Sequence, residues 1–443
     1  MSISKAPLLG PAVRTAPIQY DTLADFTAAG GATAYGVGPV WIAGQQYWCD
    51  GVGLTPVSKQ NKSYQMLKSI SGAMEGGNTN RFVAALSMIV PFTHREIQVL
   101  LFSTMATPSV GALANFGYCQ SAAVPFTPTS LTDLTYNGST TFDIPVASSG
   151  SGLTAVPSVL ALDPVSVTPA ARTDGGAGHI LHCRILNATG QPSVYVSGVH
   201  TDSVNDLDII KHVGTFFSAG SFSTVSNTTA PNNNGGCFGV KILADSPVTS
   251  FMTIGDSTMA GQGYGASSSN VSGVGKFVKD QMSLGKKCLL YNMAWGSRTS
   301  DTFYNFATAQ IPAYKPTVAI FQAGSPNDST KFTDSWASKI MRYTQYFIEI
   351  CGQNNVIPIV ATMNPNDADT TGQATYRRNF NAAIISMCNS FGVLVGDRGG
   401  FYQDASGENY ITGMSTDGLH PNKSGYDAES VNVWQPILSK FIQ

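Results

Sequence analysis

Ser257, His420 and Asp417 are the residues whose types and spacing could together do chemistry. A serine hydroxyl becomes a useful nucleophile when a base takes its proton, and His420 is the one histidine in residues 251–443. Asp417 precedes His420 by three residues, close enough in a tight turn for its carboxylate to orient the imidazole. The three residues therefore predict a nucleophile, its base and an orienting carboxylate.

Two further positions supply donors of the kind that stabilise an oxyanion. Gly296 offers a backbone N–H that no side chain obstructs, and Asn327 offers a side-chain amide. With the N–H of Ser257 they make three predicted donors, each of which typically contributes about 2.7–4 kcal/mol to a transition state. Asp256 and Trp295 adjoin these groups and are expected to line the substrate pocket.

Each motif taken alone has a plainer interpretation. The Gly-Asp-Ser segment at Ser257 is often only a turn, and Asp417-x-x-His420 could be a loop hydrogen bond or half of a metal site. Gly296 alone fits a strand-end turn, and Asn327 alone fits a helix cap. The catalytic interpretation is favoured because all four motifs follow in order at predicted strand ends or in the final loop, with complementary roles.

The elements that must position these groups alternate between strand and helix from residue 250 onward. Apolar runs predict strands at 249–254, 287–295, 318–323, 356–363 and 393–396. Amphipathic or helix-favouring segments predict helices at 272–284, 334–351, 375–391 and 424–441. Strands that are apolar on both faces and alternate with helices predict a parallel sheet covered on both sides. The ligand site of such a sheet lies beyond the carboxyl ends of its strands.

Residues before 250 follow a different pattern, and the chain is expected to be multidomain. Short runs rich in Val, Ile, Phe and Thr predict strands at 81–92, 96–103, 141–146, 156–162, 179–187, 193–199 and 237–244, and residues 225–236 read as an exposed loop. We expect a small β attachment module at 1–60, an all-β accessory domain at 61–247, sandwich or jelly-roll-like, and the catalytic α/β domain at 248–443.

The composition excludes several classes of protein. The chain has 443 residues, 25 Lys and Arg against 27 Asp and Glu, and only 12% charged residues, where about 25% is usual. The charge deficit lies mainly in residues 1–250, which hold 24 charged side chains against 28 in residues 251–443. Without a basic surplus no nucleic-acid partner is expected, and no run approaches the ~20 apolar residues of a membrane span. No signal peptide is visible at the N-terminus.

The cysteines and the paired histidines do not predict a metal site. Seven cysteines are dispersed without a Cys-x-x-Cys, which indicates buried thiols rather than a disulfide framework or a zinc site. His179 and His182 lie three apart in a predicted strand that we expect to be exposed, so they face opposite sides and make poor joint ligands. Trp41, Tyr47 and Trp48 could stack on sugar rings, but aromatic residues in a small β unit more often form its core.

The motifs at Ser257, Gly296, Asn327 and Asp417-x-x-His420 resemble the four blocks of the SGNH (GDSL-type) hydrolase family. The resemblance covers about residues 248–443 and implies an α/β/α three-layer fold and an esterase, lipase, thioesterase or carbohydrate deacetylase without metal or organic cofactor. Two positions depart from the family pattern. The third block has Ser325 where the family has glycine, which puts the loop path in question, and the nucleophile is followed by Thr258 rather than leucine.

The resemblance also implies a substrate and a setting. A β-sandwich ahead of such a domain is similar to carbohydrate acetylesterases, and the aromatic, glycine-rich N-terminal segment looks like modules of bacteriophage tail deacetylases. This implies O-acetyl groups of a bacterial surface polysaccharide as substrate, attachment to a phage tail through the N-terminal segment, a homotrimer, and a virion or extracellular location. The alternatives are a non-catalytic glycan-binding structural protein and a lipase or thioesterase of the same family.

Overall fold

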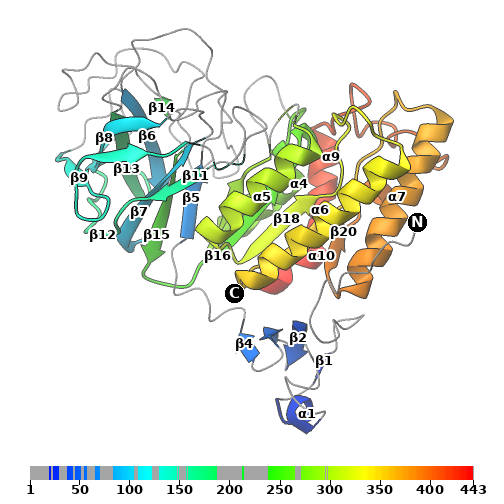
Figure 1. Ribbon diagram of the computed structural model, residues 1–443, viewed down its shortest axis with the longest axis horizontal. Coiled ribbons are helices and arrows are strands. Elements are labelled where there is room, and N and C mark those ends of the chain that lie inside the picture. Colours follow the sequence, from blue (N-terminus) through cyan, green and yellow to red (C-terminus); the bar gives the residue numbers. More distant parts are fainter. Residues whose placement is uncertain are drawn as a thin grey trace.

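The computed structural model describes residues 19–20, 23–28, 37–42, 45–50, 54–56, 65–69, 83–103, 108–121, 129–146, 148, 156, 158–186, 212–213, 238–264, 271–294, 296 and 298–442. These residues form a small sheet near the N-terminus, a β-rich part and a C-terminal α/β part (Figure 1). None of the described helices combines the length and apolar character needed to cross a membrane.

The C-terminal part is built on a five-stranded parallel sheet. Its strands, in spatial order, are β17 (Cys288–Asn292), β16 (Thr249–Ile254), β18 (Val318–Gln322), β19 (Ile357–Ala361) and β20 (Leu394–Gly396). All residues of β16, β18 and β19 are buried, which confirms the prediction of strands that are apolar on both faces. The order reverses at β16, so the ligand site of such a sheet is expected at the carboxyl end of that strand.

Helices cover both faces of this sheet. Side chains such as Met252 and Phe321 point into the core formed with α5 (Ser300–Tyr314), α6 (Asp334–Gln353) and α7 (Thr371–Ser390). Their neighbours Phe251 and Ile320 point into the opposite core, formed with α4 (Gly273–Ser283), the π-helical turn η4 (Ser430–Trp434) and α10 (Gln435–Leu438). Figure 1 shows α5 and α6 in front of the sheet. The arrangement is an α/β/α sandwich.

Two helical segments differ from the prediction. The sequence pattern does not predict α5, because Pro312 interrupts it, but Pro312 lies in the last turn, where a lost backbone hydrogen bond disturbs little of the helix. The single helix expected over 424–441 is divided into α9 (Lys423–Glu429), η4, α10 and the 3₁₀ turn η5 (Ser439–Phe441). The change in helix type falls directly after Glu429, a fully buried carboxylate.

The β-rich part consists of two antiparallel sheets whose buried side chains share one hydrophobic core. One sheet has the path β10 (Phe142–Ile144), β8 (Ser109–Cys119), β13 (His179–Leu186), β6 (Val83–Val90) and β14 (His212–Val213), with β9 (Thr132–Leu134) paired to β8. The other has the path β11 (Ser158–Ala161), β7 (His94–Ser103), β15 (Phe238–Ala244) and β5 (Gln65–Ser69), with β12 (Val165–Ser166) paired to β7. The predicted strand at 193–199 and loop at 225–236 lie outside the described residues.

The expectation that His179 and His182 lie on an exposed strand is wrong. Their strand β13 is paired on both sides, with β6 and β8. His182 is fully buried and accepts a hydrogen bond from Arg184 Nε at 3.0 Å, while His179 Nδ1 donates to the carbonyl of Ala170 at 2.9 Å. The two rings thus have separate protein partners, as residues on opposite faces of a strand must.

The small N-terminal sheet has the order β1 (Gln19–Tyr20), β2 (Val37–Ile42), β3 (Gln45–Asp50) and β4 (Leu54–Pro56), and helix α1 (Leu23–Ala28) lies between β1 and β2 in the chain. Trp41 lies on β2, and Tyr47 and Trp48 lie on β3. Their side chains are outside the described part of the structure.

The β-rich part lies against the C-terminal part along one edge of the parallel sheet. Strand β5 lies beside the edge strand β17. Lys241 of β15 donates from Nζ to the carbonyl of Ala313 in the last turn of α5 at 3.0 Å, where the partial negative charge of a helix end favours a cation. Burial, and to a lesser degree the neighbouring Lys315, lower the pKa of Lys241 to about 8.

We expect Gly396→Ala to destabilise the protein by roughly 1–3 kcal/mol through overpacking. A methyl group at this strand end would lie 2.5 Å from the buried Trp434 ring, far inside van der Waals contact. Gly372→Ala is the matched control, because nothing lies within 4 Å of that position and alanine favours a helix. The free energy of unfolding from urea denaturation measures both, and equal stability of the two variants would contradict the expectation.

Candidate active site

Ser257 follows strand β16 at the carboxyl edge of the sheet. The strand ends at Ile254, and Ser257 begins the one-turn helix α3 (Ser257–Ala260). The intervening Gly255 packs so closely that a Cβ there would lie 2.6 Å from Gln322 Oε1 and 2.7 Å from Met259 Cγ. Any side chain at this position would clash, so glycine lets the strand end pack tightly against Gln322 of β18 and Met259 of α3.

The structure brings Ser257, His420 and Asp417 into one hydrogen-bonded chain. His420 Nε2 lies 2.9 Å from Ser257 Oγ, and His420 Nδ1 lies 2.7 Å from Asp417 Oδ2. An ionised carboxylate can only accept, so the proton on the neutral ring belongs on Nδ1. Nε2 is then left to accept the serine proton, which is the arrangement of a nucleophile, a base and an orienting carboxylate.

The Asp417 carboxylate also shapes the turn that carries the base. Its Oδ1 accepts from the backbone N–H of Leu419 at 2.9 Å and of His420 at 2.7 Å. Burial by itself raises the pKa of Asp417, but the hydrogen bonds from the His420 backbone and ring and from Leu419 outweigh it and lower the pKa to about 2. The side chain is 53% exposed, so the charge is held by local hydrogen bonds rather than by a buried environment.

Gly296 lies beside the nucleophile, as the oxyanion role requires. A Cβ built on Gly296 would lie 4.0 Å from Ser257 Cβ and 3.3 Å from Gln262 Oε1. The side-chain amide of Asn327 is held in place by the segment before α5, because its Nδ2 donates to the carbonyl of Arg298 at 3.1 Å. Gln262, which the sequence motifs do not single out, thus places its side-chain amide next to Gly296.

The serine that departs from the family pattern in the third block connects these segments. Ser325 Oγ lies 3.0 Å from Asp256 Oδ2 and 2.8 Å from the Arg298 carbonyl, and it accepts from the Asn327 backbone N–H at 3.2 Å. Gly324, one place earlier, has φ of +91°, a conformation that glycine adopts without strain. The loop thus reaches the nucleophile turn by a hydroxyl hydrogen bond that glycine at position 325 could not make.

Asp256 does not line a substrate pocket as expected, because it is fully buried. Its Oδ1 accepts from the backbone N–H and the hydroxyl of Thr258, both at 2.8 Å, and its Oδ2 accepts from Gln322 Nε2 at 2.7 Å and from Ser325. Asp256 is therefore the N-cap of α3 and fixes the turn. Trp295, the other expected pocket residue, lies outside the described residues.

Two supporting groups are recognisable only in the folded chain. Asp328 accepts from Ser300 Oγ at 2.6 Å and from Trp336 Nε1 at 2.7 Å, which joins the third block to the start of α5 and to α6. Tyr410 OH donates to the carbonyl of Leu419 at 2.8 Å and so anchors the histidine loop, residues 415–422, which carries His420. In the sequence, Asp328 is signalled only by its place beside Asn327, and Tyr410 by nothing.

The described residues contain no group of three or more His, Cys, Asp or Glu side chains that could hold a metal ion. The described residues of the site offer a hydroxyl nucleophile, a nitrogen base and N–H donors.

Residues 253–428 match the model of the GDSL-like Lipase/Acylhydrolase family. The C-terminal part of the chain is thus a GDSL-like acylhydrolase domain, and the resemblance of the four motifs is confirmed. No curated protein matches the chain at a significant level.

Solved structures that are similar to this chain include several hydrolases. One is a GDSL-like lipase from Bacteroides thetaiotaomicron VPI-5482, with 13% identity over 43% of this chain and 88% of that chain and a TM-score of 0.35. Another is the acetyl xylan esterase AlAXEase, with 16% identity over 43% and 100% of the two chains and a TM-score of 0.36. A third is the lipase/acylhydrolase from Enterococcus faecalis, with 16% identity over 41% and 92% and a TM-score of 0.33.

The lowered pKa of Asp417 predicts a pH-dependent contribution to stability. Because its pKa falls from 3.8 to about 2 on folding, the carboxylate stabilises the folded state above about pH 4 and loses this effect as the pH drops through 2. The difference in free energy of unfolding between the protein and Asp417→Asn should be constant above about pH 5 and shrink below about pH 4. Urea denaturation over this range measures it, and a difference independent of pH would contradict the lowered pKa.

Proposed function

We propose that this protein is a serine esterase that removes short acyl groups, foremost acetyl, from a polysaccharide through an acyl-enzyme. The observation that carries the esterase proposal is the hydrogen-bonded chain from Ser257 Oγ through His420 to Asp417, placed at the carboxyl end of β16 in a GDSL-like domain. The acylhydrolase family supports the reaction class, and the substrate is inferred from the surroundings of the site.

The proposed reaction follows from the positions of the donors and acceptors. Ser257 Oγ attacks the ester carbonyl while His420 Nε2 takes the hydroxyl proton, and Asp417 stabilises the imidazolium that forms. The N–H groups of Ser257 and Gly296 and the amide of Asn327 hold the oxyanion. His420 then returns the proton to the leaving sugar oxygen. Water, activated by the same base, hydrolyses the acyl-enzyme to release the acid and regenerate Ser257.

The surface near the nucleophile supports a polar leaving group over a lipid. Among the described residues, the exposed large hydrophobic side chains are Val110, Val146, Leu284 and Val431, and none belongs to the turns after β16, β17, β18 or β19 or to the histidine loop. A lipase is expected to carry a contiguous apolar patch where lipid meets the site. The exposed residue next to Gly296 is instead Gln262, whose amide suits a hydroxylated substrate.

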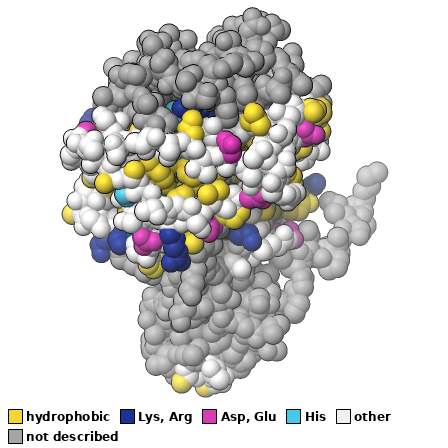
Figure 2. Space-filling model, turned by 90° about the vertical axis from the view of Figure 1, so that its left-hand side faces the viewer, with side chains coloured by type: hydrophobic (Ala, Val, Ile, Leu, Met, Phe, Trp, Pro, Cys, Tyr) yellow, Lys and Arg dark blue, Asp and Glu magenta, His cyan; other side chains and the backbone are white. Residues whose placement is uncertain are grey.

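The β-rich part is proposed to present the esterase on a virion, with the N-terminal segment attached to a phage tail as a homotrimer. Charged side chains of both signs are scattered among uncharged ones on the face of this part in Figure 2, which agrees with its charge-poor composition. Such a surface suits neutral glycans. The same observation favours glycan binding without hydrolysis as a second candidate function, which glycan retention by a protein that releases no acetate would support.

Ser257→Ala is expected to lower acetate release from a chromogenic acetate ester, and from acetylated bacterial polysaccharides, by at least about 10³-fold. Acetate release falls because alanine has no hydroxyl at which the acyl-enzyme can form. Ser283→Ala, at an exposed serine in the last turn of α4, is the matched control and should keep full turnover. Undiminished turnover by Ser257→Ala would exclude the proposed nucleophile.

Asn327→Ala tests the oxyanion donors. Loss of one preorganised donor is expected to lower kcat about 10²- to 10³-fold with little change in KM, because the donor acts on charge that develops in the transition state. Asn432→Ala serves as control, since its Nδ2 likewise donates to a backbone carbonyl, that of Ala428, but in an exposed position. A fall in kcat no larger than that of the control would remove Asn327 from the oxyanion site.

A further inference from the structure

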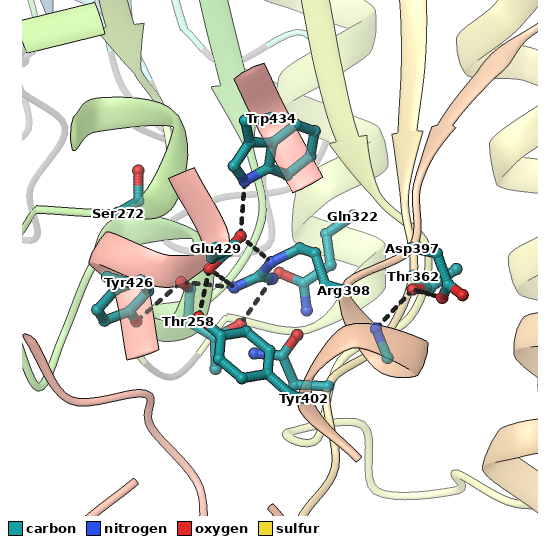
Figure 3. A network of polar contacts seen from close by, with 12 residues as sticks. Thr258, Ser272, Gln322, Thr362, Asp397, Arg398, Tyr402, Tyr426, Glu429 and Trp434 are labelled. Atoms are coloured by element: carbon teal, nitrogen blue, oxygen red, sulfur yellow. Dashed lines mark hydrogen bonds and ion pairs between the residues drawn. The ribbon is translucent and has the colours of Figure 1, made fainter. Parts of the chain in front are cut away.

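A buried ion pair, Arg398 with Glu429, contacts Thr258, the residue after the nucleophile (Figure 3). Arg398, fully buried in α8 (Arg398–Tyr402), donates from Nε to Glu429 Oε1 at 2.6 Å. Glu429 also accepts from Tyr402 OH at 2.7 Å and from Trp434 Nε1 at 2.6 Å. Burial by itself lowers the pKa of Arg398, but the carboxylate of Glu429 and the Tyr402 hydroxyl more than reverse this, so the pKa is raised and the guanidinium stays charged.

Both terminal nitrogens of this guanidinium also reach Thr258, the residue next to the nucleophile, while Nη2 makes a second, longer contact of 3.5 Å with Glu429 Oε2. Arg398 Nη1 lies 3.2 Å from Thr258 Oγ1, and Arg398 Nη2 lies 3.0 Å from the Thr258 carbonyl. Thr258 Oγ1 in turn donates to Asp256, the N-cap of the same turn. The guanidinium of Arg398 thus connects Glu429, at the end of α9, with the side-chain hydroxyl and the backbone carbonyl of Thr258.

The geometry of α3 explains why the Thr258 carbonyl needs these donors. In a continuing α-helix it would accept from the N–H of Gln262, but that N–H donates to the Ser257 carbonyl at 3.0 Å, because Gly261 ends the helix with φ of +91°. A buried carbonyl without a donor is costly. Arg398 and the hydroxyl of Tyr426, at 2.9 Å, supply the two hydrogen bonds.

We propose that Arg398 is a positioning residue for the reaction: together with Tyr426 it holds the Thr258 carbonyl and thereby fixes the one-turn helix from which Ser257 meets His420. This inference rests on the proposed esterase function. It assigns the ion pair a task beyond stability, since a buried salt bridge is by itself weak evidence for stabilisation and can often be replaced by apolar residues. What apolar residues could not supply is a pair of donors that reach the hydroxyl and the carbonyl of the residue next to the nucleophile.

Arg398→Lys keeps the charge but cannot bond Glu429 and both atoms of Thr258 at once. We expect kcat for a chromogenic acetate ester to fall about 10- to 100-fold with KM changed less than about 3-fold, because a small displacement of a reacting atom costs rate rather than binding. The rate at which an organophosphonate modifies Ser257 should fall in parallel, since it depends on the same attack by the hydroxyl. Both are measured at a temperature where melting curves show the variant to be fully folded.

Arg377→Lys is the matched control. Arg377 forms the other buried arginine–carboxylate pair of the described residues, with Nε at 3.3 Å from Asp369 and side-chain exposures of 1% and 4%, but none of its hydrogen bonds reaches the nucleophile turn. It should lower the melting temperature comparably while kcat stays within about 2-fold of the unaltered protein. Equal kcat losses in the two variants would overturn the positioning role and leave only a structural one.

Tyr426→Phe gives a second test should Arg398→Lys fail to fold. It deletes only the hydroxyl, which lies 2.9 Å from the Thr258 carbonyl and 3.0 Å from the Gln262 carbonyl and shares its one proton between them, and it leaves the ion pair intact. We expect a smaller fall in kcat and in phosphonate modification at unchanged KM. Tyr291→Phe, which removes a buried hydroxyl bonded to Gln310, is its control and should leave kcat unchanged.

The outcomes separate this inference from the proposed function. If the unaltered protein hydrolyses esters and the folded variants Arg398→Lys and Tyr426→Phe have the same kcat as it does, the positioning role is overturned. The proposed esterase function is then unaffected. An unaltered protein that neither hydrolyses esters nor reacts with the phosphonate at Ser257 would overturn both.

Discussion

The carboxylate of Asp256 is fully buried beside the nucleophile, and the geometry of the site depends on satisfying it. A buried carboxylate is tolerated only when hydrogen bonds replace the water it has lost. The donors come from Thr258 in the nucleophile turn and from Gln322 and Ser325 at the end of β18. Because these donors belong to two neighbouring strand ends, meeting the need of one carboxylate aligns the turn that carries Ser257 with the loop that carries Asn327.

The base, His420, is positioned by contacts of a different kind. His420 lies on a loop, and its orienting Asp417 is more than half exposed, so no buried charge fixes the pair. Local hydrogen bonds do so instead: the aspartate accepts from two backbone N–H groups of its own turn, and Tyr410 holds the Leu419 carbonyl from inside the domain. The nucleophile is thus set by long-range buried contacts and the base mainly by short-range ones. The two halves meet at one hydrogen bond, between Ser257 and His420.

This division explains how far the sequence could predict the site. Asp417 and His420 lie three residues apart and Ser257 follows a strand of apolar residues, so their roles are legible locally, and the strands of the parallel sheet follow from burial on both faces. The burial of Asp256, the helix α5 with its Pro312 and the central position of β13 around His182 depend on partners distant in the chain. So does the pair of Arg398 and Glu429, since thirty-one positions separate its members and a further 140 separate Arg398 from Thr258. No spacing in the sequence signals such contacts.

The contact of β5 with the edge strand β17 bears on how the protein avoids aggregation. An open sheet edge presents unpaired N–H and carbonyl groups to which a strand of another molecule can add. Here the edge at β17 is covered by the β-rich part, and the opposite edge, β20, is only three residues long. The β-rich part therefore shields the hydrolase sheet as well as accompanying it, and a chain shortened to the hydrolase domain would present β17 to its neighbours in solution.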